Sequence, residues 1–162
     1  MNQSLQNNNA EKNLVLLKKR ALYYLGKREY SRKELHEKIT PFSESLELSR
    51  QQVNQILTEL ESKGWLSDRR FADQFIFSKK RKFGLKKMEY ELKMRGVNEI
   101  IIHNALNEIK SEEYNLAKNI WEKKFRKLPE NPEERLKQMR FLQSRGINSA
   151  LIHQILSGKL SE

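Results

Sequence analysis

Two stretches of this chain are copies of each other at a fixed offset of 50 positions. Residues 92–106 read LKMRGVNEIIIHNAL and residues 142–156 read LQSRGINSALIHQIL, with seven identities and no gap. An Arg-Gly pair, an Asn suited to begin a helix and an apolar stripe recur together, which chance similarity between two helices does not produce. The chain is therefore predicted to be built from repeated units.

A weaker third copy precedes these two. The first helix of each expected unit has an Ala followed by apolar residues three and four positions later: Ala21-Tyr24-Leu25, Ala72-Phe75-Ile76 and Ala117-Ile120-Trp121. We therefore expect a disordered polar tail over 1–11, then three-helix repeats over 12–64, 65–111 and 112–162. Each repeat is too small to bury much apolar surface alone, so neighbouring repeats should stack.

The backbone is predicted to be all-α. Val and Thr, which favour strands, number five together, whereas Leu, Lys, Glu, Arg and Gln dominate and favour helices. Nine helices are expected, the first over 13–27 and the second beginning at Ser31, whose spacing to Glu34 fits a capping box. That second helix should end before Pro41. Gly96 and Gly146 are predicted to end helices in the left-handed conformation, and Ser49, Asn98 and Asn148 to begin the helices that follow.

Composition limits the kind of protein further. Hydrophobic residues make up 37% of the 162 residues, below the share of roughly 45–50% in globular domains, which favours a thin, extended helical array. With no Cys there is no disulfide, thiolate metal site or cysteine nucleophile. The longest uninterrupted aliphatic run is Ile100 to Ile102, so no membrane span is expected, and residues 1–9 lack a signal-peptide core. We expect a cytoplasmic protein.

No arrangement of residues in the sequence suggests catalysis. The three His residues form no H-E-x-x-H motif, and no glycine-rich phosphate loop or nucleophile elbow occurs. His103 and His153 occupy equivalent repeat positions, which favours packing on a helix surface over a metal pair. We therefore expect no enzymatic activity, no cofactor and no metal.

Positive charge is concentrated in the middle of the chain. The net charge is +11, which favours a polyanionic partner. The densest basic run surrounds the expected turn at 83–84 and contains only Glu89 and Glu91 as acids. We predict a partner-binding or DNA-binding site made of Lys79, Lys80, Arg81, Lys82, Lys86, Lys87, Lys93 and Arg95. Basic runs at 18–33 and 118–127 are equally well explained as solvated surface. Phe83 and the other aromatics near these runs are expected to pack in cores and not to stack on bases.

Three phrases of the sequence resemble the RecX family of regulatory proteins. They are ALYYLGKREYSRKELHEKI at 21–39, the stretch 57–106 and MRFLQSRGI at 139–147. The resemblance as a whole extends over nearly the entire chain, from about residue 12 to residue 156. Its most specific motif is G-[WY]-L-x-D-x-R-F-A, matched by Gly64, Trp65, Leu66, Asp68, Arg70, Phe71 and Ala72. The next is the Arg-Gly pair at 95–96 and 145–146.

The resemblance implies a regulator of the RecA recombinase. Such proteins are three tandem three-helix repeats in an elongated, curved array that lodges in the groove of the RecA–DNA filament. They damp its ATPase, strand-exchange and coprotease activities in recombination, DNA repair and the SOS response. The resemblance also implies weak, largely non-specific DNA binding by a monomer.

A winged-helix transcription regulator is the alternative interpretation. Residues 48–66, LSRQQVNQILTELESKGWL, are similar to a recognition helix and the turn that leaves it. Alternating strands should then follow, whereas Ser67 and Asp68 are placed to begin another helix. The wing is therefore not expected.

Overall fold

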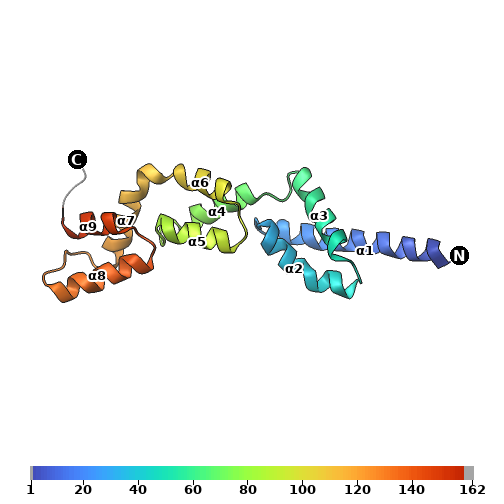
Figure 1. Ribbon diagram of the computed structural model, residues 1–162, viewed down its shortest axis with the longest axis horizontal. Coiled ribbons are helices and arrows are strands. Elements are labelled where there is room, and N and C mark those ends of the chain that lie inside the picture. The colour runs from blue at the N-terminus through green and yellow to red at the C-terminus, as the bar shows by residue number, and fades with distance from the viewer. Residues whose placement is uncertain (1, 159–162) are drawn as a thin grey trace. The chain divides into compact units, whose positions relative to one another are not determined.

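The computed structural model describes residues 2–158, with side chains from residue 7 onward (Figure 1). Over these residues the chain forms helices and no strands, which confirms the all-α prediction. Its contacts divide into two compact units, Met1–Phe71 with Arg95–Val97 and Ala72–Met94 with Asn98–Glu162. Among the described helices, none is both long and apolar enough to cross a membrane.

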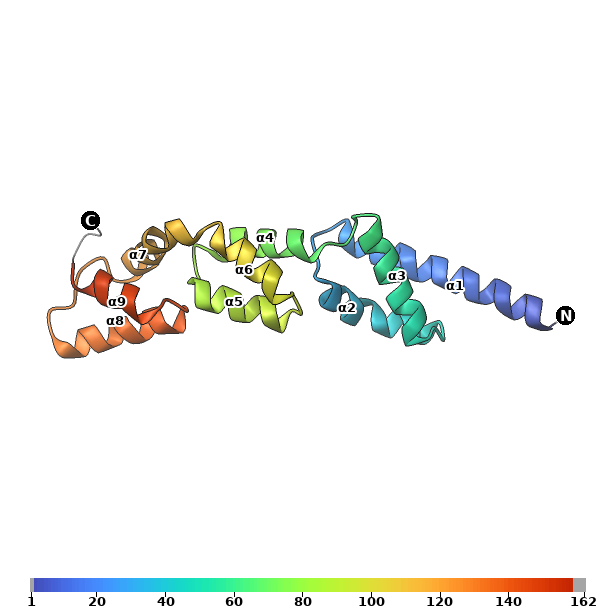
Figure 2. The ribbon, with the colours of Figure 1, turned by 45° about the horizontal axis from the view of Figure 1, so that its top comes forward.

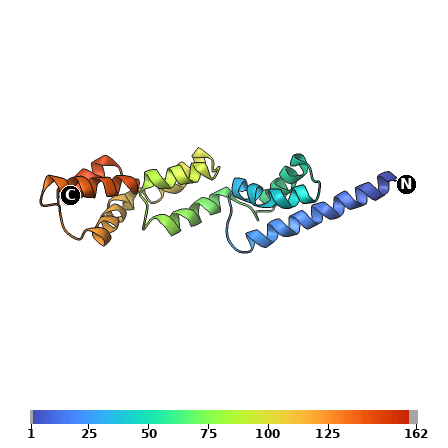
Figure 3. The same cartoon turned by 90° about the horizontal axis from the view of Figure 1, so that it is seen from below.

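The first unit is built around a long N-terminal helix. It contains α1 (Asn2–Leu25), α2 (Arg32–Ser45) and α3 (Arg50–Ser62). α1 packs on both of the others, and its N-terminal end extends past them in Figures 1 and 3. Leu17, Leu35 and Leu57, one from each helix, are fully buried together in its core.

Helix α1 begins earlier than the sequence indicates. Residues 2–11 are helical in the structure, where we expected a disordered tail, and the predicted start lay at residue 13. These residues contain no Pro or Gly, and extending an existing helix does not need a new nucleus. The amphipathic part of α1, anchored by the buried Leu17 and Ala21, therefore supplies the nucleus from which the polar turns continue.

The prediction that α2 ends before Pro41 is wrong, because the helix continues through Pro41 to Ser45. Pro41 has no backbone N–H to donate to the carbonyl oxygen of Glu37, and the helix continues despite the loss of this bond. Ser43 is buried, and Phe42 packs against the core of the unit. Tertiary packing of the last turn therefore outweighs the local cost of the proline.

The second unit contains the remaining helices and the end of α4. Its elements are α4 (Asp68–Lys79, which begins in the first unit), α5 (Leu85–Met94), α6 (Glu99–Asn107), the 3₁₀ turn η1 (Lys110–Glu112), α7 (Glu113–Lys124), α8 (Pro132–Ser144) and α9 (Ser149–Leu156). α5 lies against α6, and α7, α8 and α9 pack together (Figure 2). Trp121, Leu142 and Ile152 are buried in the core that these last three helices share.

Most helix boundaries follow the predicted caps. Ser49 caps α3 with a complete capping box to Gln52, and Asn98 and Asn148 cap α6 and α9. Gly96 and Gly146 have φ values of 76° and 79°, which confirms the left-handed conformation. After Gly64 the chain enters α4, so the described residues contain no wing next to α3. This argues against the winged-helix alternative.

Candidate partner-binding site

Six of the eight predicted site residues gather around the connection between α4 and α5. We call Lys79, Lys80, Arg81, Lys82, Lys86 and Lys87 the basic turn. The turn is closed by the backbone N–H groups of Lys82 and Phe83, which donate to the carbonyl oxygen of Lys79 at 2.8 and 2.9 Å. Arg81 and Lys82 are exposed at its tip, so the turn presents a dense positive charge to solvent.

Phe83 lies between two of these lysines. The Nζ atoms of Lys79 and Lys87 are 5.9 and 4.5 Å from the centroid of its ring. The ring is half-buried and lines a small apolar cavity with Met88 and Leu116. Phe83 therefore has a packing role, as expected, and its face holds the two amines near the surface.

The N-terminal end of α5 is held by a distant turn. Gly84 precedes α5 and has no side chain that could cap it. Instead, the N–H of Gly84 donates to the carbonyl oxygen of Arg145 at 2.7 Å, and the N–H of Lys86 donates to that of Gly146 at 3.2 Å. The second bond satisfies a backbone donor that a helix start leaves free. The turn between α8 and α9 thereby fixes the helix that carries Lys86 and Lys87.

The other two predicted residues do not join the basic turn. Lys93 binds Glu89 and Glu99 with N–O distances of 3.0 and 3.3 Å. The hydrogen bonds to these carboxylates raise the pKa of Lys93 above its usual value. Arg95 belongs to the first unit, where its Nε lies 3.4 Å from Glu34.

A groove beside the basic turn adds a cation that the sequence did not assign to it. Lys80 and Arg81 line this groove together with Leu116, Asn119, Glu122 and Lys123. Lys80 also lies 3.8 Å from a carboxylate oxygen of Glu112. Helix α7 thus brings part of the separate basic run at 118–127 next to the basic turn. A run of charge alone could not indicate this, because the contact depends on how α7 packs.

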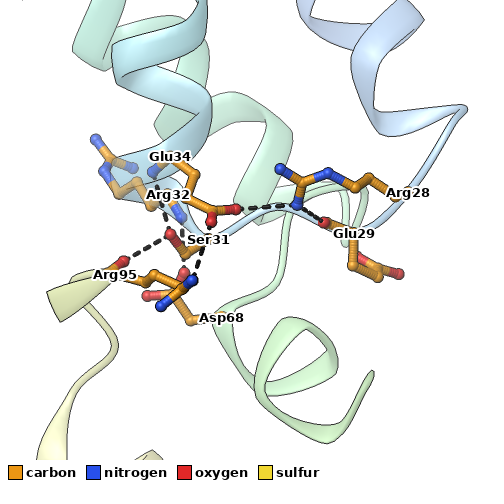
Figure 4. A network of polar contacts seen from close by, with 7 residues as sticks. All are labelled: Arg28, Glu29, Ser31, Arg32, Glu34, Asp68 and Arg95. Atoms are coloured by element: carbon orange, nitrogen blue, oxygen red, sulfur yellow. Dashed lines mark hydrogen bonds and ion pairs between the residues drawn. The ribbon is translucent and has the colours of Figure 1, made fainter. Parts of the chain in front are cut away.

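The Arg-Gly turn at 95–96 is held by a polar network in the first unit, shown in Figure 4. The hydroxyl of Ser31 donates to the carbonyl oxygen of Arg95 at 2.6 Å and accepts from the N–H of Glu34 at 3.1 Å. The carboxylate of Glu34 pairs with Arg28 at 3.0 Å as well as with Arg95. Ser31 thus caps α2, as predicted, and also binds the turn.

The most specific motif of the sequence contributes to the same network. Asp68 accepts a hydrogen bond from the N–H of Arg32 at 2.7 Å, so it caps α2 from outside the helix (Figure 4). Burial raises the pKa of its carboxyl group. Arg70 binds Glu29 at 2.9 Å, while Leu66, Phe71 and Ala72 are buried. These motif residues thus contribute to packing and to the polar contacts around the start of α2.

Two histidines at equivalent repeat positions have different surroundings. The Nδ1 atom of His153 lies 3.4 Å from the guanidinium of Arg135, and His103 lines a groove between α5 and α6. Among the described residues, no three His, Asp or Glu side chains are arranged to hold a metal ion.

Sequence profiles match two parts of the chain. Residues 67–106 match the second three-helix domain of RecX, and residues 111–156 match the third. The regulatory protein RecX of Chromobacterium violaceum is 39% identical over 142 residues, which are 88% of this chain and 90% of that protein. The chain belongs to the RecX family.

Other comparisons agree with this assignment. The regulatory protein RecX of Ralstonia pickettii is 36% identical over 88% of this chain and 87% of its own length. The crystal structure of RecX from Lactobacillus salivarius matches with a TM-score of 0.73, covering 91% of this chain and 96% of that one at 18% identity. A second crystal structure of a regulatory protein RecX gives a TM-score of 0.80, covering 97% and 78% at 18% identity. The likeness to both structures supports the RecX fold.

Proposed function

We propose that this RecX-family chain binds the RecA–DNA filament and inhibits the ATPase, strand-exchange and coprotease activities of RecA. It would act in the cytoplasm, as a monomer, in recombination, DNA repair and the SOS response. The family supports this proposal, since the relatives are named regulatory proteins. The proposed mode of action is competition without catalysis. The bound chain bridges neighbouring RecA protomers and blocks either access to the filament or growth of the filament.

The basic turn is the observation that carries the proposal. Six cations lie within nine residues of sequence, and Lys123 lines the groove beside them. A surface of this kind binds nucleic acid favourably because binding releases counterions from the phosphate backbone, and this effect does not depend on the base sequence. We therefore also propose weak, largely non-specific DNA binding through the basic turn, with Lys93 and Arg95 playing structural parts.

We propose further that the chain is organised as three three-helix repeats, at 12–64, 65–111 and 112–162. The profile matches over 67–106 and 111–156 support the second and third repeats. Helices α1, α2 and α3, which share one core, support the first. Limited proteolysis tests this organisation, since cleavage should concentrate near residues 64 and 111.

The function is tested by titrating the protein into a RecA ATPase assay that depends on single-stranded DNA. We expect ATP hydrolysis to fall as the chain approaches an equimolar ratio to RecA. A charge-reversed variant, with Arg81 and Lys82 both changed to Glu, should inhibit less at every concentration. Unchanged hydrolysis at equimolar wild-type protein would refute the proposed regulation.

A further inference from the structure

Helix α5 presents two large apolar side chains to solvent. Tyr90 is 61% exposed and Met94 is 56% exposed, and they lie one turn apart on the same face of the helix. Aromatic residues and Met are enriched in protein–protein interfaces, where a few of them account for most of the binding energy. The two side chains therefore form a compact apolar patch on α5, the helix that follows the tip of the basic turn.

A groove begins at one end of this patch. It lies between α5 and the turn that joins α8 to α9, and Lys86, Lys87 and Tyr90 form one wall. Gly146 lies in the opposite wall, next to Ile147. An apolar group could enter beside Tyr90, and a carboxylate attached to the same partner could reach the two lysines.

The chemistry of this groove differs from that of the basic turn. The groove contains an acid, Glu91, and the neutral side chains of Gln143 and Ser149. Arg81 and Lys82, by contrast, are exposed next to each other at the tip of the basic turn. A phosphate backbone carries a charge at every nucleotide, so the two exposed cations at the tip attract it more strongly than a groove that also contains an acid and an exposed aromatic ring. A protein surface that alternates apolar and acidic side chains is complementary to the groove.

We propose that Tyr90 and Met94, together with Lys86 and Lys87, contact the protein component of the filament and not its nucleic acid. The site takes an apolar side chain against Tyr90 and a neighbouring carboxylate against the lysines. This inference rests on the proposed function and deepens it, because it divides one continuous region between two kinds of partner. Nucleic acid is left to the tip of the basic turn.

The experiment measures binding of the full chain to three probes. Since the chain has no Cys, a single cysteine appended after residue 162 carries a fluorophore for anisotropy measurements. The probes are bare single-stranded DNA, RecA without DNA, and RecA filaments assembled on the same DNA. The variants are Tyr90→Ala, Tyr90→Phe and, as a matched control, Phe77→Ala, whose ring is 76% exposed on α4 outside the groove.

Tyr90→Ala should weaken binding to filaments by about tenfold or more and leave binding to bare DNA unchanged. Tyr90→Phe keeps the ring and should bind filaments almost as well as the wild type. Phe77→Ala should bind filaments with the affinity of the wild type. Equal filament binding by Tyr90→Ala and wild type would overturn the inference, as would an equal loss on bare DNA. Failure of the wild type itself to bind filaments or RecA would instead refute the proposed function.

Discussion

Gly146 has no space for a side chain, because Lys87 lies directly against it. A Cβ atom at Gly146 would come within 2.4 Å of both the backbone nitrogen and the Cβ of Lys87. The residue also has a φ of 79°, which side chains disfavour. The glycine is therefore needed twice, once for the turn between α8 and α9 and once for the approach of that turn to α5.

Gly146→Ala should destabilise the second unit more than the backbone conformation alone explains. The left-handed conformation costs about 1 kcal/mol and the overlap with the Lys87 backbone about 2 kcal/mol more. Gly64→Ala is the matched control, because Gly64 has a φ of 72° but a Cβ added there would meet no atom within 4 Å. Gly64→Ala should lower the free energy of unfolding by only about 1 kcal/mol. Urea unfolding followed by circular dichroism measures both, and equal losses would contradict the packing argument.

The first unit shows that the left-handed conformation does not by itself require glycine. Glu47 follows α2 at the position that Gly96 and Gly146 hold after α5 and α8, and its φ is 56°. Its side chain is exposed. By contrast, a Cβ at Gly96 would come within 2.8 Å of the Lys33 side chain. At Gly96 and Gly146, the turn packs against the start of another helix and leaves no room for a side chain.

Glu59 should stabilise the first unit in a pH-dependent way. Hydrogen bonds from Lys18 and Lys63 lower the pKa of its carboxyl group from 4.5 to about 2. A carboxyl group whose pKa is lower in the folded state stabilises the fold above its unfolded pKa, and that stabilisation is lost as the pH falls through the folded value. Glu59→Gln should lower the melting temperature by roughly 2 °C at pH 7.

The difference in melting temperature should shrink between pH 4.5 and about pH 2 and vanish below that. Glu37→Gln is the control, because Glu37 is 63% exposed and lies 3.9 Å from Lys33. It should have little effect at any pH. A difference for Glu59→Gln that stays constant across this pH range would rule out the proposed origin in the two lysines.

Because Gln138 forms a buried hydrogen bond, its substitution should destabilise the fold more than substitution of an exposed polar residue. The indole N–H of Trp121 donates to its side-chain oxygen at 2.7 Å, and both residues are buried. Gln138→Met leaves that N–H without an acceptor and should cost roughly 2 kcal/mol. In a Trp121→Phe background the same change should cost about 1 kcal/mol less, since no indole N–H remains and only the hydrogen bond from the Gln138 amide to the carbonyl oxygen of Lys127 is lost. Equal costs in both backgrounds, measured by urea unfolding, would count against the bond.

Local signals in the sequence predicted much of the fold. Side-chain oxygens of Ser31, Ser49, Asn98 and Asn148 each accept from a backbone N–H of the helix they begin. These caps depend only on residues two or three positions apart, so sequence spacing reveals them. The recurring apolar triplets likewise indicated buried positions: all three residues of Ala72-Phe75-Ile76 and Ala117-Ile120-Trp121 are buried, and Ala21 is buried with Tyr24 and Leu25 partly buried beside it.

Long-range contacts were beyond the reach of these signals. The helical turn after Pro41 depends on packing of Phe42 against residues of other helices. The anchoring of α5 depends on carbonyl groups at 145 and 146, about 60 residues away in sequence. The same limit applies to the predicted site, which stays a prediction: six of its residues lie together at the basic turn, whereas Lys93 and Arg95 bind carboxylates elsewhere, and packing of α7 places Lys123 beside the turn.

Binding to assembled filaments at increasing salt tests the role of the basic turn most directly. Arg81→Glu with Lys82→Glu is compared with Lys137→Glu and Arg140→Glu, two exposed residues of α8 whose reversal changes the net charge equally. We predict that the first pair weakens binding to RecA–DNA filaments at least tenfold and lowers the salt slope by about 2, while the second pair resembles the wild type. Equal affinity and equal salt slope for all three proteins would contradict the account.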